Sequence, residues 1–337
     1  MLLLISALVV FALPFAAPVF AQNPTPPSPA RSPAVQFVPV EKDIKLEVLD
    51  RGGTGRPLVL LAGLGGTAHV FDKFARKLTS RYHLFGITRR GFGASSTPPP
   101  VPASYTADRL GDDVLAVCAY LRLQRPILVG HSIAGEELSS LGSRHPEKIA
   151  GLVYLDATSA YAFYDPSQGD FLLDLYELQD KLRDLGSRDR VANSGGALDR
   201  RPVVSELRLT LLPRFEKDLE VWQNDVQGVP PPPPIHGSKT ARDWAPVLIF
   251  AGERKFTQIP VPVLAIIAVP HDFSFVRDPE LRAAWDRQRM SAQANAFERG
   301  VPTAHVVRLA HANHLIYQSN EADVLREINM FVTKLPE

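Results

Sequence analysis

The sequence predicts a doubly wound α/β fold built around a mostly parallel sheet. Short apolar runs alternate along the chain with segments of helical spacing, and this alternation is typical of parallel strands that helices cover on both faces. The alternation stops once, over residues 158–259, where long helical patterns take its place. We therefore expect a core made of residues 37–157 and 260–337, interrupted by a mostly helical insertion.

The elements of the core follow from this alternation. Residues 44–50 alternate in polarity and are expected to form an edge strand. The other strands are expected at the apolar runs, residues 56–63, 82–88, 126–131, 149–157, 261–269 and 304–310. Helices are expected at the amphipathic segments, residues 69–78, 106–123, 134–145, 279–300 and 321–335.

The insertion has a different pattern. Residues 171–185 and 204–225 have the spacing of long helices, and residues 229–237 form a proline-rich run. The apolar run over residues 245–252 is expected to be the first strand after residue 158.

The N-terminal segment predicts export. Residues 1–21 are almost wholly apolar and end on Val-Phe-Ala, which has the small residues that signal peptidase requires. We expect a cleaved signal peptide over residues 1–21, a Pro- and Ser-rich linker over residues 22–36, and a periplasmic or secreted protein. A run of about 20 apolar residues is also long enough to span a membrane, so an uncleaved anchor is the alternative.

Composition and motifs argue against a nucleic-acid surface, an intrachain disulfide and a metal site. The 37 Lys and Arg residues nearly balance the 36 Asp and Glu residues, so no basic surface for nucleic acid is expected. Cys118 is the only cysteine; it allows no intrachain disulfide, and we interpret it as a small core residue. The sequence has no H-E-x-x-H motif and no clustered Cys or His spacing, so no metal is expected.

A strand that turns sharply into a helix with serine at the bend is a nucleophile elbow, written G-x-S-x-G. Residues 130–135 read Gly-His-Ser-Ile-Ala-Gly and lie between a short buried strand and a helix. Alanine at the fifth position of the motif keeps the small side chain that this strained turn needs. We interpret Ser132 as a nucleophile rather than as a cap of the following helix.

A serine nucleophile needs a base within hydrogen-bond reach and an acid that orients the base. In this motif's fold the chain order is Ser, then Asp or Glu, then His. His311 and His314 both follow the last strand, and we prefer His314. Asp272 follows the strand over residues 261–269 and is our preferred acid, with Asp156, one strand earlier, as the alternative.

The same chemistry needs donors for an oxyanion. We expect the backbone N–H of Ile133, directly after the nucleophile, to be one donor. The second is expected from the glycine-rich loop after residues 56–63, and by position we assign it to the backbone N–H of Leu64. We interpret His131 as a local packing residue and His69 as a possible contact at the mouth of the site.

With these residues identified, the chain resembles the α/β-hydrolase superfamily. The resemblance is carried in order by "LLAGLGG", "YHLFGITRRGFGAS", "LVGHSIAG", "LVYLDA", "PVLAIIAVPHD" and "ANHLIY". It implies an α/β-hydrolase fold in which the segment after the sixth strand, residues 158–259, forms a helical cap over the active site. It also implies a serine hydrolase, because epoxide hydrolases and haloalkane dehalogenases of this family carry a carboxylate at the elbow instead of serine. No cofactor is implied.

We expect hydrolysis of a small-molecule carboxylic ester, thioester or amide through an acyl-enzyme. One alternative is an NADP-binding Rossmann-type oxidoreductase, because Gly63, Gly65 and Ala68 fit the pattern G-x-G-x-x-G/A. In that interpretation Arg89 or Arg90 would meet the 2′-phosphate. A second alternative is a hydrolase-like binding protein that has lost catalysis.

Overall fold

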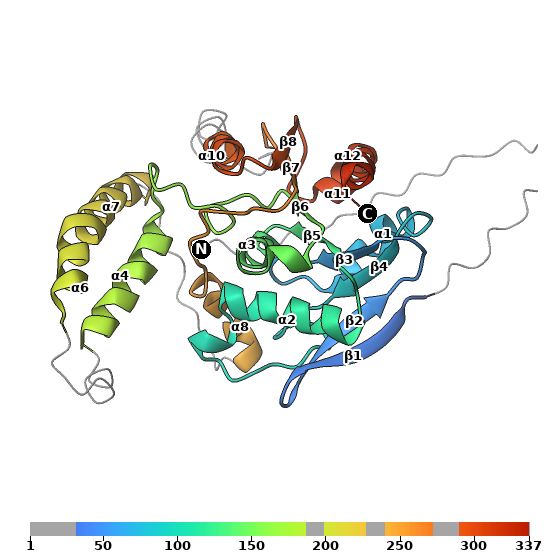
Figure 1. Ribbon diagram of the computed structural model, residues 1–337, viewed down its shortest axis with the longest axis horizontal. Helices are drawn as coiled ribbons and strands as arrows, with labels where there is room; N and C mark the ends of the chain where they lie inside the picture. The colour runs from blue at the N-terminus through green and yellow to red at the C-terminus, as the bar shows by residue number, and fades with distance from the viewer. Residues whose placement is uncertain (1–31, 187–198, 227–239, 272–289, 337) are drawn as a thin grey trace, which may run out of the picture.

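A computed structural model describes residues 32–186, 199–226, 240–271 and 290–336. Its centre is an eight-stranded sheet in the order β1-β2-β4-β3-β5-β6-β7-β8 (Figure 1). The strands are β1 (Ala34–Glu41), β2 (Ile44–Asp50), β3 (Pro57–Leu61), β4 (His83–Ile87), β5 (Ile127–His131), β6 (Gly151–Leu155), β7 (Val263–Ala268) and β8 (Ala304–Leu309). Only the β1–β2 and β2–β4 pairings in this sheet are antiparallel, which confirms the predicted mostly parallel sheet.

Helices cover both faces of the sheet, and this explains the continuous apolar runs of the central strands. Successive side chains of a strand point to opposite faces. Val59 and Leu128 accordingly pack in one hydrophobic cluster, and their neighbours Leu60 and Ile127 in another. The first cluster lies under α2 (Ala107–Tyr120), α3 (Ala134–Arg144) and α10 (Ala292–Gly300). The second lies under η1 (Ala68–Phe71), α1 (Asp72–Arg76), α11 (Ile316–Ser319) and α12 (Glu321–Lys334).

The N-terminal edge of the sheet differs from the prediction. Residues 44–50 form a strand, but β2 is not the edge, because β1 pairs along its other side. The new edge strand begins at Ala34, inside the predicted linker over residues 22–36. Most of its side chains are exposed or half-buried, with Val38 buried, so its sequence has no apolar run to reveal it. The predicted signal peptide over residues 1–21 lies outside the described residues.

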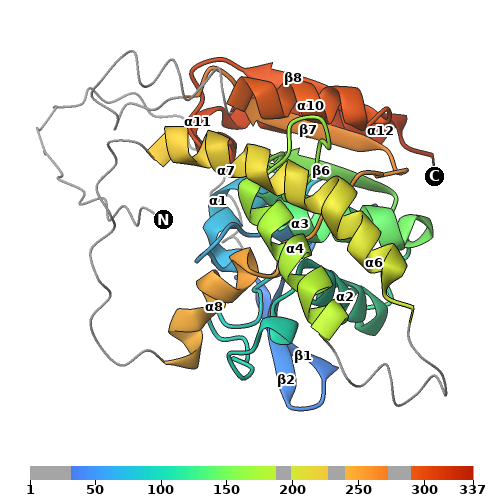
Figure 2. The same ribbon diagram turned by 90° about the vertical axis from the view of Figure 1, so that its left-hand side faces the viewer.

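The segment between β6 and β7 is mostly helical, as predicted. It contains α4 (Phe171–Gly186), α6 (Arg201–Glu206), the π-helical turn η4 (Leu207–Leu211), α7 (Leu212–Val226) and α8 (Ala241–Phe250). Leu178 of α4 packs against Leu207 and Leu211. Helices α4, α6 and α7 stand at one side of the core in Figure 1, and Figure 2 shows α4 and α7 running side by side.

The strand predicted over residues 245–252 is wrong, because most of this run belongs to α8. Thr240 and Asp243 form a capping box at the start of that helix, a strong signal for a helix N-terminus. Ala245, Leu248 and Ile249 are buried at helical spacing, whereas the apolar run alone does not distinguish a helix from a strand. The proline-rich run over residues 229–237 lies outside the described residues.

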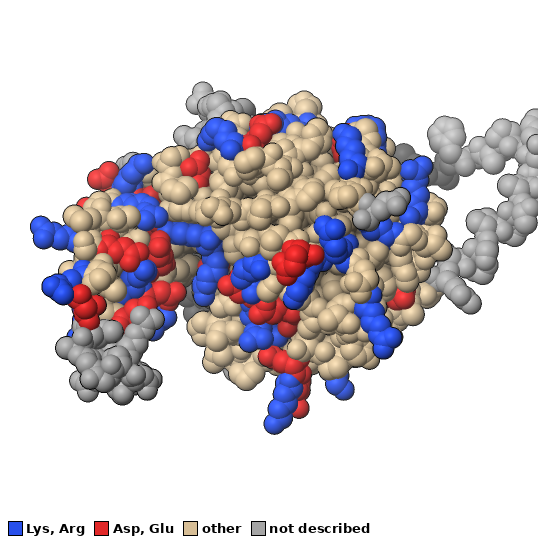
Figure 3. Space-filling view, in the orientation of Figure 1, with Lys and Arg blue, Asp and Glu red and all other residues tan. Residues whose placement is uncertain are grey.

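Two surface properties bear on partners. Among the described residues, no helix combines the length and the apolar character needed to cross a bilayer. On the face drawn in Figure 3, basic and acidic side chains are interspersed, as expected from the nearly balanced composition.

Candidate active site

The predicted elbow is present at the end of β5. Ser132 has a φ of 55°, and α3 begins two residues later at Ala134. This left-handed backbone is uncommon for a residue with a side chain, and it turns the half-buried serine out of the sheet. Close neighbours leave little room for side chains at the turn: a Cβ atom at Gly135 would lie 2.1 Å from the Ala157 carbonyl oxygen. At Gly130 it would lie 2.9 Å from a Leu138 methyl carbon.

Ser132 and His314 are brought together, as predicted. The Ser132 hydroxyl lies 2.8 Å from Nε2 of His314. The Nδ1 of the same imidazole lies 2.7 Å from Oδ2 of Asp156. The three residues come from three loops, after β5, β6 and β8. A serine hydroxyl, an imidazole and a carboxylate in this order are the groups needed to activate the serine as a nucleophile.

Of the two acids weighed from the sequence, the structure brings the alternative, Asp156, to His314. The preferred acid, Asp272, lies outside the described residues and its role stays a prediction. Strands β6 and β7 are parallel neighbours, so their carboxyl ends lie at the same edge of the sheet. A loop after either strand can therefore present an acid to one histidine.

Asp156 is a buried carboxylate that accepts three hydrogen bonds or polar contacts. Its Oδ1 accepts the Ala268 N–H at 3.0 Å, and its Oδ2 faces both His314 Nδ1 and, at 3.3 Å, His271 Nε2. Burial alone raises the pKa of this carboxyl, but the hydrogen bonds from His271, His314 and Ala268 outweigh it and lower the pKa to about 2. Asp156 is therefore ionised at neutral pH and holds the proton of His314 on Nδ1.

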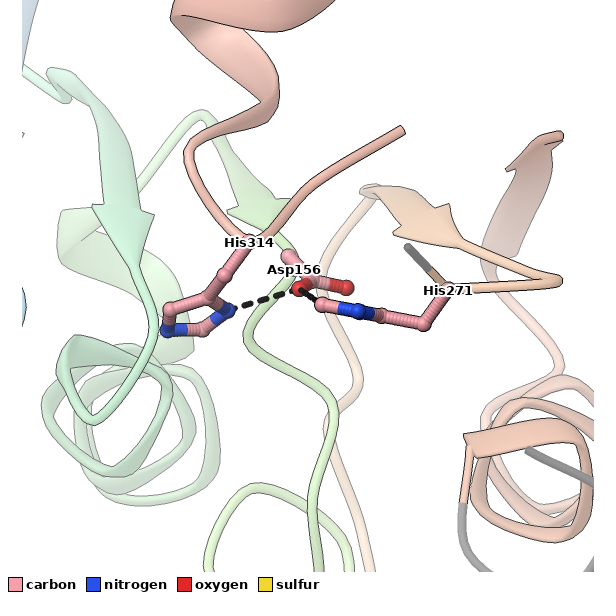
Figure 4. Close-up of side chains that lie close together, drawn as sticks. All are labelled: Asp156, His271 and His314. Atoms are coloured by element: carbon pink, nitrogen blue, oxygen red, sulfur yellow. Dashed lines mark hydrogen bonds and ion pairs between the residues drawn. The ribbon is translucent and has the colours of Figure 1, made fainter. Parts of the chain in front are cut away.

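Two further histidines lie beside the residues of the candidate site, and the sequence predicted the position of only one of them. His131 packs inside, as predicted, and its Nε2 lies 2.8 Å from the His314 carbonyl oxygen. Burial, together with the charge of His314, lowers the pKa of His131 to about 4. The neutral ring therefore donates to the backbone that carries His314. His271, which the sequence did not single out, contacts Asp156 (Figure 4).

The two other histidines weighed from the sequence, His311 and His69, do not take these positions. His311, the weaker choice for the base, is exposed, and the place beside Ser132 is taken by His314. His69 faces the carboxylates of Glu47 and Asp72, at 3.6 and 3.8 Å. Its expected contact at the mouth of the site stays a prediction.

The two residues expected to supply oxyanion donors lie in one hydrophobic cluster. The half-buried Leu64 packs against the cluster that contains Ile133. The loop of Leu64 also passes close to the nucleophile, since a Cβ atom at Gly63 would lie 3.1 Å from Cβ of Ser132. The assignment of their backbone N–H groups as donors stays a prediction.

The arginines of the dinucleotide alternative are used inside the fold. Arg89 donates two hydrogen bonds to Glu137, at 2.6 and 2.9 Å. Arg90 donates two to Asp113, at 2.7 and 2.6 Å. Both guanidinium groups are buried, so they tie the loop after β4 to α3 and α2 and are poorly placed to meet a phosphate.

Cys118 is buried and unbridged. Burial raises the pKa of its thiol to about 12, which removes the thiolate that a cysteine nucleophile needs. This agrees with its interpretation as a small core residue.

Comparison with known proteins gives the same fold. Fluoroacetate dehalogenase from a Burkholderia species is 29% identical over 116 residues, which are 34% of this chain and 38% of that protein. The chain spans about two fifths of the length of the curated relatives it matches. A solved hydrolase from Pseudomonas aeruginosa PA01 has a TM-score of 0.56 and 20% identity, covering 88% of this chain and 98% of that one. A thermophilic esterase from Thermogutta terrifontis has a TM-score of 0.53 and 18% identity, covering 90% and 99%.

These likenesses to solved structures show the fold. The sequence profile of a family described as alpha/beta hydrolase fold matches residues 56–252, which is more than half of the chain. The matched range contains the elbow and Asp156, and the mostly parallel sheet with a helical insertion between β6 and β7 agrees with the resemblance. The position of this insertion as a cap over the active site stays a prediction. The chain belongs to the alpha/beta hydrolase fold family.

Proposed function

We propose that the protein is a serine hydrolase that cleaves a carboxylic ester of a small molecule through an acyl-enzyme. The observation that carries the proposal is the connected set of polar groups from Ser132 Oγ through both ring nitrogens of His314 to Asp156. It provides a nucleophile, a base and an orienting acid in hydrogen-bond contact.

In the proposed reaction His314 removes the Ser132 proton through Nε2 as the oxygen attacks the ester carbonyl. Asp156 keeps the other imidazole proton on Nδ1 and stabilises the imidazolium that forms. The N–H groups of Ile133 and Leu64 bind the oxyanion. His314 then protonates the departing alcohol. In the second step His314 takes a proton from the water that attacks the acyl-enzyme, and it donates this proton to Ser132 Oγ as the bond to the acyl group breaks and the carboxylic acid leaves.

Serine at the elbow separates this proposal from other chemistry of the fold. A covalent ester intermediate on a carboxylate needs Asp or Glu at the nucleophile position, and this chain has Ser132 there. The relative that is named a fluoroacetate dehalogenase therefore gives no reason to assign dehalogenation here. Thioesters and amides pass through the same kind of tetrahedral intermediate and remain within the proposed substrate class.

The proposal is tested with a chain-length series of p-nitrophenyl esters. The wild-type protein is expected to hydrolyse part of the series, with Ser132→Ala reducing kcat by about 10⁴-fold or more. Ser80→Ala is the matched control, because Ser80 is an exposed serine in a surface turn, and it should retain wild-type turnover. Folded wild-type protein without hydrolysis of any ester, thioester or amide, but with saturable NADPH binding, would favour the dinucleotide alternative. Absence of both would favour a binding protein.

We also propose that residues 1–21 direct export and are removed. The apolar run and the residues before Gln22 support this. Intact-mass measurement of the protein isolated from an exporting bacterial host should give a chain beginning at Gln22. A mass that includes Met1 in membrane-bound material would instead indicate an anchor.

A further inference from the structure

A second histidine lies against the acid of the site. His271 lies three residues after the end of β7. It forms an isolated parallel bridge with Ala312, which is two residues before His314. Its side chain is 8% exposed, and its Nε2 lies 3.3 Å from the same Oδ2 of Asp156 that faces His314 Nδ1. Figure 4 shows the carboxylate of Asp156 between the two imidazole rings.

The polar environment of Asp156 gives this contact its importance. The Asp156 side chain is 0% exposed, so water does not supply the hydrogen bonds that a carboxylate needs in the interior. The Ala268 N–H serves Oδ1, and the two histidines serve Oδ2. An ionised carboxylate only accepts hydrogen bonds, so His271 faces it with a protonated Nε2 and His314 with a protonated Nδ1.

We propose that His271 is a positioning residue, which donates from Nε2 to Asp156 and thereby sets the orientation and the basicity of the carboxylate that serves His314. This inference rests on the proposed serine hydrolase function. With His271 in place, Asp156 Oδ2 accepts from two donors, His271 Nε2 and His314 Nδ1. Without it, Asp156 interacts more strongly with protonated His314 and holds that imidazolium more tightly. The carboxylate also loses one of the contacts that fix its rotamer.

The spacing of these groups favours hydrogen bonding over metal binding. Asp156, His271 and His314 each place one ligand atom within 4.8 Å of the others. Ligand atoms about 2.0–2.2 Å from a tetrahedral zinc ion lie roughly 3.4 Å apart. The 2.7 Å between His314 Nδ1 and Asp156 Oδ2 is shorter than this and is the distance of a charge-assisted hydrogen bond.

The other titratable groups that face the pair in the described residues are few. His131, from β5, has its ring centroid 4.6 Å from that of His314, and burial keeps its pKa near 4. Tyr161, from the segment after β6, has its pKa raised by burial and by the charges of Glu253, Asp156 and Glu136. Neither changes charge near neutral pH, whereas Glu253, whose charge acts on Tyr161, has its pKa raised to about 8 by burial. The variants compared below leave Glu253 unchanged, so a difference between their pH profiles is assigned to the change at His271.

The experiment compares His271→Leu, which removes the donor, with His271→Gln, which keeps a side-chain N–H. For the leucine variant, kcat should fall by about 10- to 100-fold, the range found when hydrogen-bond partners of metal-ligating residues are removed. KM should stay within about 3-fold. The acidic limb of kcat/KM should move to higher pH by roughly 0.5–1 unit, which corresponds to one lost hydrogen bond. The glutamine variant should recover most of the turnover and the wild-type limb.

Two outcomes would overturn the inference. One is a folded His271→Leu protein with wild-type kcat and wild-type pH profile. The other is a His271→Gln protein that folds and is as impaired as the leucine variant. If His271→Leu does not fold, His271→Asn takes its place, because the shorter asparagine side chain is not expected to reach Asp156 Oδ2. The same two outcomes, read with His271→Asn in place of His271→Leu, would then overturn the inference.

The proposed function is checked separately in the same samples. Fluorophosphonate labelling of Ser132 in wild-type protein reports on the nucleophile and does not depend on His271 being a donor. If wild-type protein and His271→Leu are labelled at the same rate over the whole pH range, only the positioning role of His271 is refuted. Wild-type protein without label would refute the serine hydrolase function itself.

Discussion

Asp156, at the end of β6, hydrogen-bonds at 2.7 Å to His314, which follows β8 and is 158 residues away in the chain. Strand β7 lies between β6 and β8 in the sheet, so the carboxylate reaches past one strand to meet the imidazole. The backbone of Asp156 has a φ of 48°, a left-handed conformation that costs free energy for a residue with a side chain. The surrounding sheet holds this bend and aims the carboxylate at the histidine.

Replacing Asp156 by Asn should abolish most of the activity. The amide is neutral and cannot stabilise the imidazolium of His314, and its NH₂ group favours the wrong tautomer, so kcat should fall by about 10³- to 10⁴-fold. The matched variant is Asp272→Asn, which should keep kcat within about 3-fold. Steady-state kinetics on one p-nitrophenyl ester distinguish them. If Asp156→Asn keeps near-wild-type turnover and Asp272→Asn loses it, the acid that serves His314 is Asp272 and not Asp156.

Replacing Glu253 by Gln should change the pH dependence of stability. Burial, with the charge of Asp170, raises the pKa of Glu253 from 4.5 to about 8. The folded protein therefore binds this proton more tightly than the unfolded chain. The resulting stabilisation is complete below about pH 4.5 and is lost as the pH rises through about 8.

Thermal unfolding measured from about pH 5 to about pH 9 tests this linkage. The Tm of wild-type protein should decline over this window by several degrees more than that of Glu253→Gln. Glu147→Gln, at an exposed acid, is the control and should follow the wild type. Parallel curves for all three proteins would contradict a raised pKa at Glu253.

Adding one methyl group at the elbow should destabilise the protein. The Cβ atom of Gly135→Ala would lie 2.1 Å from the Ala157 carbonyl oxygen, so the helix or the loop after β6 must move. We expect a loss of about 2 kcal/mol or more in the free energy of unfolding. Gly186→Ala is the control because, among the described residues, nothing lies within 4 Å of its Cβ position. Urea unfolding of both variants tests the difference, and equal midpoints would refute the close approach.

Breaking the pair between Arg89 and Glu137 should be costly. Both side chains are almost fully buried, at 5% and 4% exposure, and Arg89→Met leaves the Glu137 carboxylate without its cation. The expected loss in the free energy of unfolding is about 3–5 kcal/mol. Arg183→Met, which breaks an exposed pair with Asp180, should cost less than about 1 kcal/mol. Similar small losses at both sites would show that Arg89 is not needed inside the fold.

Much of the fold was predictable because its signals are local. Buried strands such as β5 read as continuous apolar runs, and the small residues around Ser132 are required by the strained turn. The contact of His314 with Ser132 was also predictable, since the segment after the last strand offers few histidines. These features depend on short stretches of sequence whose physical constraints are strict.

The remainder depends on pairing and contact across the chain. Strand β1 was missed because an edge strand buries little and its pairing partner, β2, is what stabilises it. Helix α8 was taken for a strand because an apolar run looks the same in both, and the capping box at Thr240 was the signal that distinguishes them. The approach of Asp156 and His271 to one another depends on adjacent loops after β6 and β7, which no local pattern specifies.

The most direct measurement is to map the fluorophosphonate adduct by mass spectrometry in wild-type protein and in His314→Asn. The adduct is expected on the peptide that contains Ser132 in the wild type, and its formation should slow by about 10³-fold or more in the variant. An adduct on a different residue, or equal labelling rates in two folded proteins, would contradict a Ser132 nucleophile activated by His314.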